Sequence, residues 1–480
     1  MTRLIAMLRG LSGPKLAALA AGIVLLLGGA GVAAYVVLKR DSDQSCAPPC
    51  KLEVQKPTRH REEVKTVDWP YYGYDQQRTR YLPTKRVRPP YDASNWSLQV
   101  GKLIEFAPIV AKGTLYFQDK NAVFYAVDAD TGKVLWKKRI GALGAASPGY
   151  SHGVVYAVTL QTAPGVDQGE ALAMRAKDGK LLWRFEFPGR SETSPVIAGR
   201  NVFVGSESGD IYGLDRKDGR VDWHVSTDGE VKGGLALDGG VLYGGNYAGQ
   251  VFAIRASNGQ FVWQSSTQGL SLGRGGSVYS TPAAAFGRIF LGSIDNRVYS
   301  FDQDTGDLLW SHSTGDWVYA APAVADTPRA GPTVYVGSKD QNFYALDAKT
   351  GEVRWQKDLG GVILGAGTVL GEVVYVAALG PNVGTLGFDA KTGHKVFDSD
   401  LGEYNPVISD GARLYLTGTT GIRAFEHETE AERKREAQRR QAKRERQQAA
   451  HRAKRKRQEA AHRGARQDEK GNQGGGRKRK

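Results

Sequence analysis

Two segments of the chain carry aspartates at the alternating spacing of a calcium-binding loop. Residues 128–132 and 302–306 both read Asp-x-Asp-x-Gly. A loop that coordinates Ca²⁺ through oxygen atoms also needs a further acidic ligand and a terminal Glu, and both segments lack them. We therefore interpret the two segments as hairpin turns, and we expect no metal site in them.

Histidine and glycine give no other chemical site. Residues 269–276 have the glycine content of a phosphate-binding loop, but they lack Gly-Lys-Ser/Thr and a following helix, so we expect a loop between two repeats. The histidines show no metal-ligand spacing; they are His60, His152, His224, His312, His394, His427, His451 and His462. The sequence therefore assigns no catalytic residue, and any cofactor-binding residue is unknown.

A repeat with a period near forty residues is the strongest pattern, and such repeats determine a fold. Each copy has a small residue, an apolar residue, Asp or Arg, two variable residues, then Thr, Asp or Asn, then Gly, with an aromatic residue four positions later. The seven pairs are Gly132 and Trp136, Gly179 and Trp183, Gly219 and Trp223, Gly259 and Trp263, Gly306 and Trp310, Gly351 and Trp355, and Gly393 and Phe397.

Each copy is expected to form a strand, a tight hairpin and a second strand. Asp or Asn bonds backbone amides inside the turn, and Gly supplies the positive φ that the hairpin requires. The aromatic residue then lies on the following strand and packs against a neighbouring unit. Two further apolar runs precede each turn, which makes four strands in a unit of 40 to 47 residues. This is the size of a β-propeller blade.

The two ends of the repeat region predict the number of blades. Residues 405–409, 413–418 and 421–425 form three strands of an incomplete last unit. Trp96 lies 40 residues before Trp136 on an isolated strand. We predict that this strand completes the last blade, because the splice removes an open sheet edge. The predicted fold class is all-β, an eight-bladed propeller of four-stranded antiparallel blades, with seven blades as the alternative.

The repeat resembles that of the PQQ-like propeller superfamily from about Asp68 to His427. The lead-in at residues 68–75, followed by Thr79 and Arg80, is similar to the usual entry segment of this family. Its members include quinoprotein alcohol and glucose dehydrogenases and the lipoprotein propeller of the outer-membrane β-barrel assembly machinery. The resemblance implies the fold and says little about activity, since one fold hosts many functions.

The resemblance to the quinoprotein dehydrogenases implies features that this sequence does not show. Those enzymes carry a disulfide between adjacent cysteines over the cofactor, a calcium ion and an aspartate base. Here Cys46 and Cys50 lie outside the propeller and are not adjacent, and the chain has no room for long active-site insertions. We therefore expect a non-catalytic protein without PQQ or calcium, with a PQQ-dependent oxidoreductase as the alternative.

The strand order predicts two different ends of the propeller. The hairpin turns share one end, and the loops between blades share the other end with the loops that join the second and third strands. The loops of this second end mix charged and aromatic residues, the types that dominate binding hot spots. The candidate partner-binding residues are Arg190, Glu207, Lys232, Tyr247, Arg274, Asp295, Trp317, Tyr319, Lys339 and Asp340.

An uncharged run of 23 residues, 16–38, precedes the repeats. As a helix it is about 34 Å long, enough to cross a hydrocarbon core of about 30 Å. No clear cleavage site follows it, so we interpret it as a signal-anchor, with a cleaved signal peptide as the alternative. The flanking charges do not fix its orientation. A disulfide between Cys46 and Cys50 would favour an extracytoplasmic propeller.

The carboxyl-terminal tail carries most of the net charge of the chain. Residues 428–480 hold 20 Lys or Arg and 8 Asp or Glu, whereas the first 427 residues have a net charge of +3. The tail has no aromatic residue to stack on bases, so nucleic acid is not an expected target. We expect a partly helical, partly disordered tail that attaches to anionic lipid or wall polymer, with a purely solubilising tail as the alternative.

Together these patterns predict a single-pass membrane protein. Its expected segments are a cytoplasmic end (1–15), a transmembrane signal-anchor (16–38), a linker (39–67), the propeller (68–427) and the basic tail (428–480). We expect the propeller to bind envelope proteins as a non-catalytic scaffold. An extracytoplasmic ligand sensor is a further alternative, although the segment before the span is short for a signalling domain.

Overall fold

The computed structural model of the chain divides into two units, Met1–Leu52 and Glu53–Lys480. The described residues are 66–91, 95–269, 275–380 and 384–427, with 441, 447 and 448, and all belong to the second unit. The predicted segment 16–38, Cys46, Cys50, Arg274 and nearly all of the tail lie outside them. Within the described ranges, no helix is long and apolar enough to cross a membrane.

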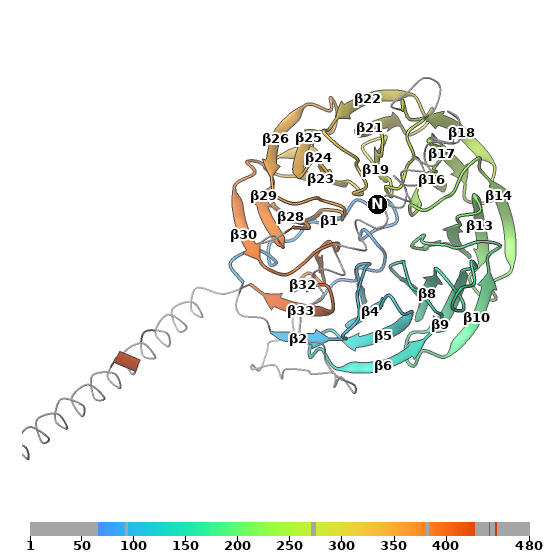
Figure 1. The fold of residues 1–480 in the computed structure, drawn as a ribbon, viewed down its shortest axis with the longest axis horizontal. Helices are drawn as coiled ribbons and strands as arrows, with labels where there is room; N and C mark the ends of the chain where they lie inside the picture. The colour runs from blue at the N-terminus through green and yellow to red at the C-terminus, as the bar shows by residue number, and fades with distance from the viewer. Residues whose placement is uncertain are drawn as a thin grey trace, which may run out of the picture. The chain divides into compact units, whose positions relative to one another are not determined.

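Eight separate β-sheets stand around a common centre and form an eight-bladed propeller (Figure 1). Each blade has four antiparallel strands, and in blades 1 to 7 these strands follow one another in the chain. The predicted fold class and the number of blades are therefore confirmed.

Strands are given from the first to the fourth. Blade 1 consists of β3 (Ile109–Ala111), β4 (Thr114–Gln118), β5 (Val123–Asp128) and β6 (Val134–Arg139), and blade 2 of β7 (Gly149–Ser151), β8 (Val154–Thr159), β9 (Glu170–Arg175) and β10 (Leu181–Glu186). Blade 3 consists of β11 (Val196–Ala198), β12 (Asn201–Gly205), β13 (Asp210–Asp215) and β14 (Val221–Ser226), and blade 4 of β15 (Ala236–Asp238), β16 (Val241–Gly245), β17 (Gln250–Arg255) and β18 (Phe261–Ser266).

Blade 5 consists of β19 (Ala283–Ala285), β20 (Arg288–Ser293), β21 (Arg297–Asp302) and β22 (Leu308–Ser313), and blade 6 of β23 (Ala323–Thr327), β24 (Gly331–Gly337), β25 (Asn342–Asp347) and β26 (Val353–Asp358). Blade 7 consists of β27 (Thr368–Leu370), β28 (Val373–Ala377), β29 (Thr385–Asp389) and β30 (Lys395–Ser399). Blade 8 consists of β31 (Ile408–Ser409), β32 (Arg413–Thr417), β33 (Gly421–Glu426) and β2 (Trp96–Gln99).

The apolar core lies between neighbouring blades. The second and third strands of each blade are almost wholly buried, because the adjacent blades cover both faces of the sheet. The fourth strands lie at the outside of the ring, and there exposed residues alternate with more buried ones, as in β10. This pattern produces the short apolar runs and the aromatic-bearing strands of the repeat.

The repeated Asp closes the hairpin between the third and fourth strands. In blade 1, Asp128 accepts hydrogen bonds from the backbone amide and the hydroxyl of Thr131, at 2.8 and 2.6 Å. In blade 5, Asp302 accepts from the amides of Asp304 and Thr305, at 3.0 and 2.9 Å. Both calcium-like segments are therefore hairpin turns, as the sequence predicts.

Each repeat tryptophan lies on the turn of the next blade. The carbonyl that accepts from its indole N–H always lies three residues before the glycine of that turn, at 2.9 to 3.1 Å. A Cβ added to any of these seven glycines would lie 2.5 to 2.8 Å from the indole ring. The indole and glycine pairs are Trp96 and Gly132, Trp136 and Gly179, Trp183 and Gly219, Trp223 and Gly259, Trp263 and Gly306, Trp310 and Gly351, and Trp355 and Gly393.

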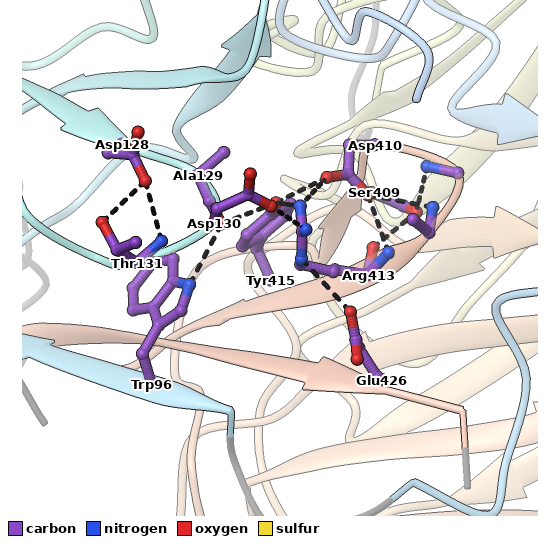
Figure 2. A network of polar contacts seen from close by, with 12 residues as sticks. Trp96, Asp128, Ala129, Asp130, Thr131, Ser409, Asp410, Arg413, Tyr415 and Glu426 are labelled. Atoms are coloured by element: carbon purple, nitrogen blue, oxygen red, sulfur yellow. Dashed lines mark hydrogen bonds and ion pairs between the residues drawn. The ribbon is translucent and has the colours of Figure 1, made fainter. Parts of the chain in front are cut away.

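An amino-terminal strand closes the ring. β2 pairs antiparallel with β33, with Trp96 opposite Ala424, so the predicted splice is confirmed. The contact between blades 8 and 1 is reinforced by Arg413, whose guanidinium forms ion pairs with Asp130 of the blade 1 turn and, at 2.7 Å, with Asp410 (Figure 2). Tyr415 donates to Asp410 at 2.7 Å and to the carbonyl of Ala129 at 3.2 Å. Arg413 and Asp410 are buried, with 6% and 2% of their side chains exposed.

The segment that precedes β2 passes round the inner strands of the ring. It is hydrogen-bonded in turn to blades 8, 1, 2, 3, 4, 5, 6 and 7, through Val67, Trp69, Pro70, Gln76, Gln77, Thr79 and Arg80. It ends in β1 (Tyr81–Leu82), which pairs parallel with β27 as a fifth strand on the inner side of blade 7 (Figure 1). We call residues 66–82 the entry segment. It contacts every blade, so the ring is tied together from the inside as well as by the indoles.

The indole contact predicts a steep cost for a methyl group at a turn glycine. Gly219 has φ +77° and its added Cβ would lie 2.6 Å from Trp183, so Gly219→Ala should lower the stability by about 3 kcal/mol. Gly240→Ala is the matched control, since Gly240 has φ +80° and open space around it; it should cost about 1 kcal/mol. Thermal midpoints measured side by side test this, and equal losses would show that the indole contact adds no constraint.

The Arg413 network predicts that ring closure depends on a buried ion pair. Arg413→Met leaves the Asp410 carboxylate buried without its partner and should cost about 3–5 kcal/mol. Arg354→Met removes a comparable pair with Asp347, but both side chains are more than a quarter exposed, so the loss should be about 1 kcal/mol or less. Denaturation monitored by circular dichroism measures both. If the two variants unfold alike, the network does not secure the closure.

Candidate functional site

The two ends of the propeller differ in which loops they carry. The hairpin turns lie beside the loops that join the first and second strands, as the hydrogen bond from Ala129 to Gly113 shows. At the opposite end, the loops between blades bond the loops that join the second and third strands, as Glu207 bonds Arg190 and Lys339 bonds Trp317 through their backbones. We call this second end the mouth. The nine described candidate partner-binding residues belong to its loops, and Arg274 lies outside the described residues.

Charged residues of blades 3 and 4 form one connected group at the mouth. The Nε and Nη2 atoms of Arg190 each lie 2.8 Å from the Glu207 carboxylate. The Lys232 ammonium lies 3.4 Å from Glu207, 3.3 Å from Glu230 and 3.9 Å from Glu192. We call these five residues the mouth cluster. Lys232 and Glu207 are largely buried, with 14% and 8% of their side chains exposed, so the cluster is held in place.

Glu192 and Glu207 behave as a coupled carboxyl pair. Burial and the hydrogen bond with Glu207 raise the pKa of Glu192 to about 7, against the opposing effects of Lys232 and Tyr279. Burial also acts to raise the pKa of Glu207, but the hydrogen bond from Glu192 and the neighbouring Lys232 and Arg190 outweigh it and lower that pKa. Below about pH 7 the pair therefore holds one proton, on Glu192, and the negative charge lies on Glu207.

Four aromatic rings run along the mouth from blade 4 to blade 6. The ring centroids lie 6.3 Å apart for Tyr247 and Tyr279, 5.3 Å for Tyr279 and Tyr319, and 5.7 Å for Tyr319 and Trp317. We call these residues the aromatic row. A lysine lies over each end of it, Lys232 at 5.1 Å from the Tyr247 ring and Lys339 at 4.2 Å from the Trp317 ring.

Tyr279 connects the aromatic row to the mouth cluster. Its hydroxyl donates a hydrogen bond to Glu192 at 2.8 Å, which joins the loop before blade 5 to the loop before blade 3. Burial and the charge of Glu192 raise the pKa of Tyr279, so its hydroxyl stays protonated and can donate. The mouth therefore presents a continuous surface, acidic and basic over blades 3 and 4 and aromatic over blades 4 to 6.

Two of the predicted residues bond a tyrosine of their own blade and an amide of the inter-blade loop that precedes it. Asp295 is 2% exposed and accepts hydrogen bonds from Tyr299 at 2.5 Å and from the Gly269 amide at 2.9 Å. Asp340 accepts from Tyr344 at 2.6 Å and from the Gly315 amide at 2.7 Å. Of the described candidates, the structure brings Arg190, Glu207, Lys232 and Tyr247 together, and it places Trp317, Tyr319 and Lys339 together on blade 6.

Glu192, Glu230 and Tyr279 belong to the site but are not among the sequence-based candidates. The repeat contains a signal for Glu192 and Tyr279, because each of them lies four residues before the first strand of its blade. The equivalent positions in blades 1 to 7 are Glu105, Ala145, Glu192, Lys232, Tyr279, Tyr319 and Leu364. Five of these seven equivalent positions in the loops between blades carry a charged or aromatic residue.

The PQQ-dependent alternative would need a calcium site among the side chains of the ring. Within the parts of the chain that the structure describes, no group of three or more His, Cys, Asp or Glu residues is placed to hold a metal ion. The inner strands are bonded to the entry segment, and the buried Arg78 donates to carbonyls that directly precede the first strands of blades 3 and 4. We therefore derive no step through PQQ or calcium.

Comparison with known families finds one model along the repeats. The family model described as outer membrane protein assembly factor BamB matches residues 85–232, 223–327 and 317–426. The matched stretches overlap and together cover all eight blades.

Two sequence relatives match shorter stretches. Outer membrane protein assembly factor BamB of Legionella pneumophila is 29% identical over 97 residues, which are 20% of this chain and 23% of that protein. The 1-butanol dehydrogenase (cytochrome c) of Thauera butanivorans is 27% identical over 126 residues, which are 24% of this chain and 18% of that enzyme. The chain thus spans less than a quarter of the length of either relative in these matches.

Solved structures share the fold. BamB from Moraxella catarrhalis superposes with a TM-score of 0.56 at 18% identity, over 70% of this chain and 99% of that one. The quinohemoprotein alcohol dehydrogenase ADHIIG from Pseudomonas putida HK5 superposes with a TM-score of 0.60 at 14% identity, over 75% of this chain and 80% of that one. At these identities the likeness establishes the propeller fold alone.

The carboxyl pair predicts a pH dependence of stability with a definite sign. The pKa of Glu192 in the folded chain, about 7, lies above its ordinary value of 4.5, so ionising it opposes folding. The stability of the natural protein should therefore fall, relative to Glu192→Gln, as the pH rises from about 5 to about 8, by about 3 kcal/mol at most. Thermal midpoints across this range measure the difference.

The matched control for this experiment is Asp178→Asn. A hydrogen bond from Arg175 lowers the pKa of Asp178 to about 2, so this exposed group is ionised throughout the same range. The Asp178→Asn profile should run parallel to that of the natural protein above about pH 4. Parallel profiles for Glu192→Gln as well would refute the coupled pair.

Proposed function

We propose a protein-binding function for this chain, which belongs to the family described as outer membrane protein assembly factor BamB. In this proposal the propeller is a non-catalytic scaffold, and the mouth is the surface that contacts a partner protein. The partner is an envelope protein, as the names of the BamB relatives suggest.

The aromatic row is the observation that best supports this proposal. Tyr and Trp residues give binding surfaces a large contact area at a small cost in side-chain entropy. Tyr247, Tyr279, Tyr319 and Trp317 are all partly exposed, and neighbouring contacts hold each of them in place. The adjoining mouth cluster adds fixed charges, which favour one orientation and one set of partners.

The segments outside the propeller supply its attachment in this proposal. Residues 16–38 anchor the chain in a membrane as a signal-anchor, residues 39–67 link it to an extracytoplasmic propeller, and residues 428–480 bind anionic lipid or wall polymer. One hydrophobic span together with a polybasic segment would keep the propeller at the envelope, where an envelope partner is found.

A PQQ-dependent oxidoreductase is the second candidate, and the match to the 1-butanol dehydrogenase supports it. PQQ would supply the two-electron oxidation chemistry in such an enzyme. Reconstitution of the purified protein with PQQ and calcium, followed by absorbance and dye reduction with alcohols, tests this candidate directly. A stoichiometric absorbance change with turnover would favour it over the scaffold.

The scaffold proposal predicts that a pair of changes in the aromatic row removes the partner. Trp317→Ala combined with Lys339→Glu deletes the exposed end of the row and reverses the charge above it, so partner recovery should fall at least about 30-fold. The measurement is quantitative mass spectrometry of proteins that crosslink to the tagged chain in intact cells. An unchanged thermal midpoint shows that the ring stays folded.

The matched control lies on the turn end of the same blade. Lys349→Glu combined with Val353→Ala changes an exposed lysine and a valine that is 44% exposed, away from the mouth. Partner recovery should stay within about twofold of that of the natural protein, since changes outside a hot spot cost little. Loss of the partner with this pair, and its retention with the mouth pair, would reject the mouth as the binding surface.

A further inference from the structure

Two arginines of the entry segment are wholly buried inside the ring. Arg78 and Arg80 both have 0% of their surface exposed. A buried guanidinium is costly unless its five N–H donors find acceptors and its charge finds a partner. The two residues differ in how far the surrounding blades meet these needs.

The donors of Arg78 are well supplied with acceptors. Its Nε donates to the Leu235 carbonyl at 2.8 Å, and its Nη1 donates to the Tyr72 carbonyl at 2.6 Å. Its Nη2 lies 3.0 and 3.1 Å from the carbonyls of Ser194 and Pro195. Arg78 thus holds the entry segment to the inner strands of blades 3 and 4. Burial, followed by the charge of Arg80, lowers its pKa to about 9.

Only one of the three guanidinium nitrogens of Arg80 has hydrogen-bond acceptors among the described residues. Its Nη1 donates to the carbonyls of Arg78 and Pro322, at 2.5 and 3.1 Å. Its Nε and Nη2 are buried and have no hydrogen-bond partner among the described residues. These two atoms form one edge of the planar guanidinium, with parallel N–H bonds. This is the edge that pairs with both oxygens of a carboxylate or phosphate.

The surroundings of Arg80 leave positive charge uncompensated. Asp75 is the carboxylate that acts on both arginines, and its two oxygens accept from Thr79, at 2.8 Å from the amide and 2.5 Å from the hydroxyl. One carboxylate against two guanidinium groups leaves a net charge of +1 in the interior. A single anion would balance it, whereas water would satisfy the donors and leave the charge.

Two features keep the guanidinium edge in a fixed position. The Tyr72 ring lies 4.8 Å from Cζ of Arg80, on a face of the guanidinium. Gly73 has φ +86°, and a Cβ there would lie 3.3 Å from the same Cζ atom, so only glycine leaves that side uncrowded. The edge is therefore preorganised within the entry segment.

We propose that the Nε and Nη2 edge of Arg80 binds a small oxyanion, a carboxylate or a phosphate, inside the propeller ring. The anion accepts both N–H donors and balances the charge of the two arginines. Because the entry segment contacts all eight blades, the bound anion stabilises the junction of that segment with the ring. The proposed anion does not depend on the proposed partner protein.

The first test measures anions carried by the purified full chain. After extensive gel filtration in chloride, the protein is denatured, and the released anions are identified by ion chromatography and mass spectrometry. We expect about one phosphate or one small carboxylate per chain, and the identity of the released anion distinguishes the two sources. Arg80→Met should carry less than a tenth of this amount. Arg86→Met, which changes an exposed arginine, should carry the full amount.

The second test uses the natural protein and Arg80→Lys, so that it does not depend on the folding of Arg80→Met. Phosphate or acetate at constant ionic strength should raise the thermal midpoint of the natural protein by about 2 °C for each tenfold increase above the dissociation constant. Lysine keeps the charge but not the paired donors, so Arg80→Lys should respond less than half as strongly. No released anion together with no response beyond that to chloride would overturn the proposal. Anion release that is equal in Arg80→Met and in the natural protein would overturn it as well.

Discussion

The contact of an indole with a glycine turn is the constraint on which the rest of this structure depends. Each repeat tryptophan covers the turn of the next blade and donates its N–H to a carbonyl of that turn. Since the glycine must have a positive φ and must lack a Cβ, turn geometry and blade spacing are set by the same residue. The contact between blades 8 and 1 has the same form, because Trp96 of β2 covers Gly132. The same local contact, repeated from blade to blade, thus also joins the last blade to the first and closes the ring.

The closed ring places loops from different blades side by side, and the mouth is a product of that placement. Glu192 and Tyr279 are 87 residues apart in the chain and belong to loops before blades 3 and 5, yet they share a hydrogen bond. Lys232 of the intervening loop lies over Tyr247 and beside Glu207. The entry segment bonds the inner strands of the blades, and its arginines donate to backbone carbonyls that directly precede the first strands of blades 3, 4 and 6.

The blades, their number and the closing strand could be predicted from the sequence because they depend on local periodicity. The spacing from Gly132 to Trp136 recurs in every copy, and Trp96 keeps that period without a turn of its own. The contacts within the candidate site were harder to predict from the sequence. They join different blades and therefore depend on the curvature of the ring, which no single repeat encodes. Asp295 illustrates the difficulty: its loop was correctly assigned to the mouth, but its side chain bonds Tyr299 within the blade. The path of the entry segment along all eight blades likewise left no periodic signal.

Photo-crosslinking in intact cells tests the assignment of binding to the mouth most directly. A photoreactive amino acid is placed at Tyr319 in the aromatic row or at Lys349 on the turn end, and the crosslinked proteins are identified and quantified. A specific envelope protein is expected to crosslink from position 319 and to be absent from position 349. Crosslinking of the same protein from position 349 alone, or equally from both positions, would contradict the assignment.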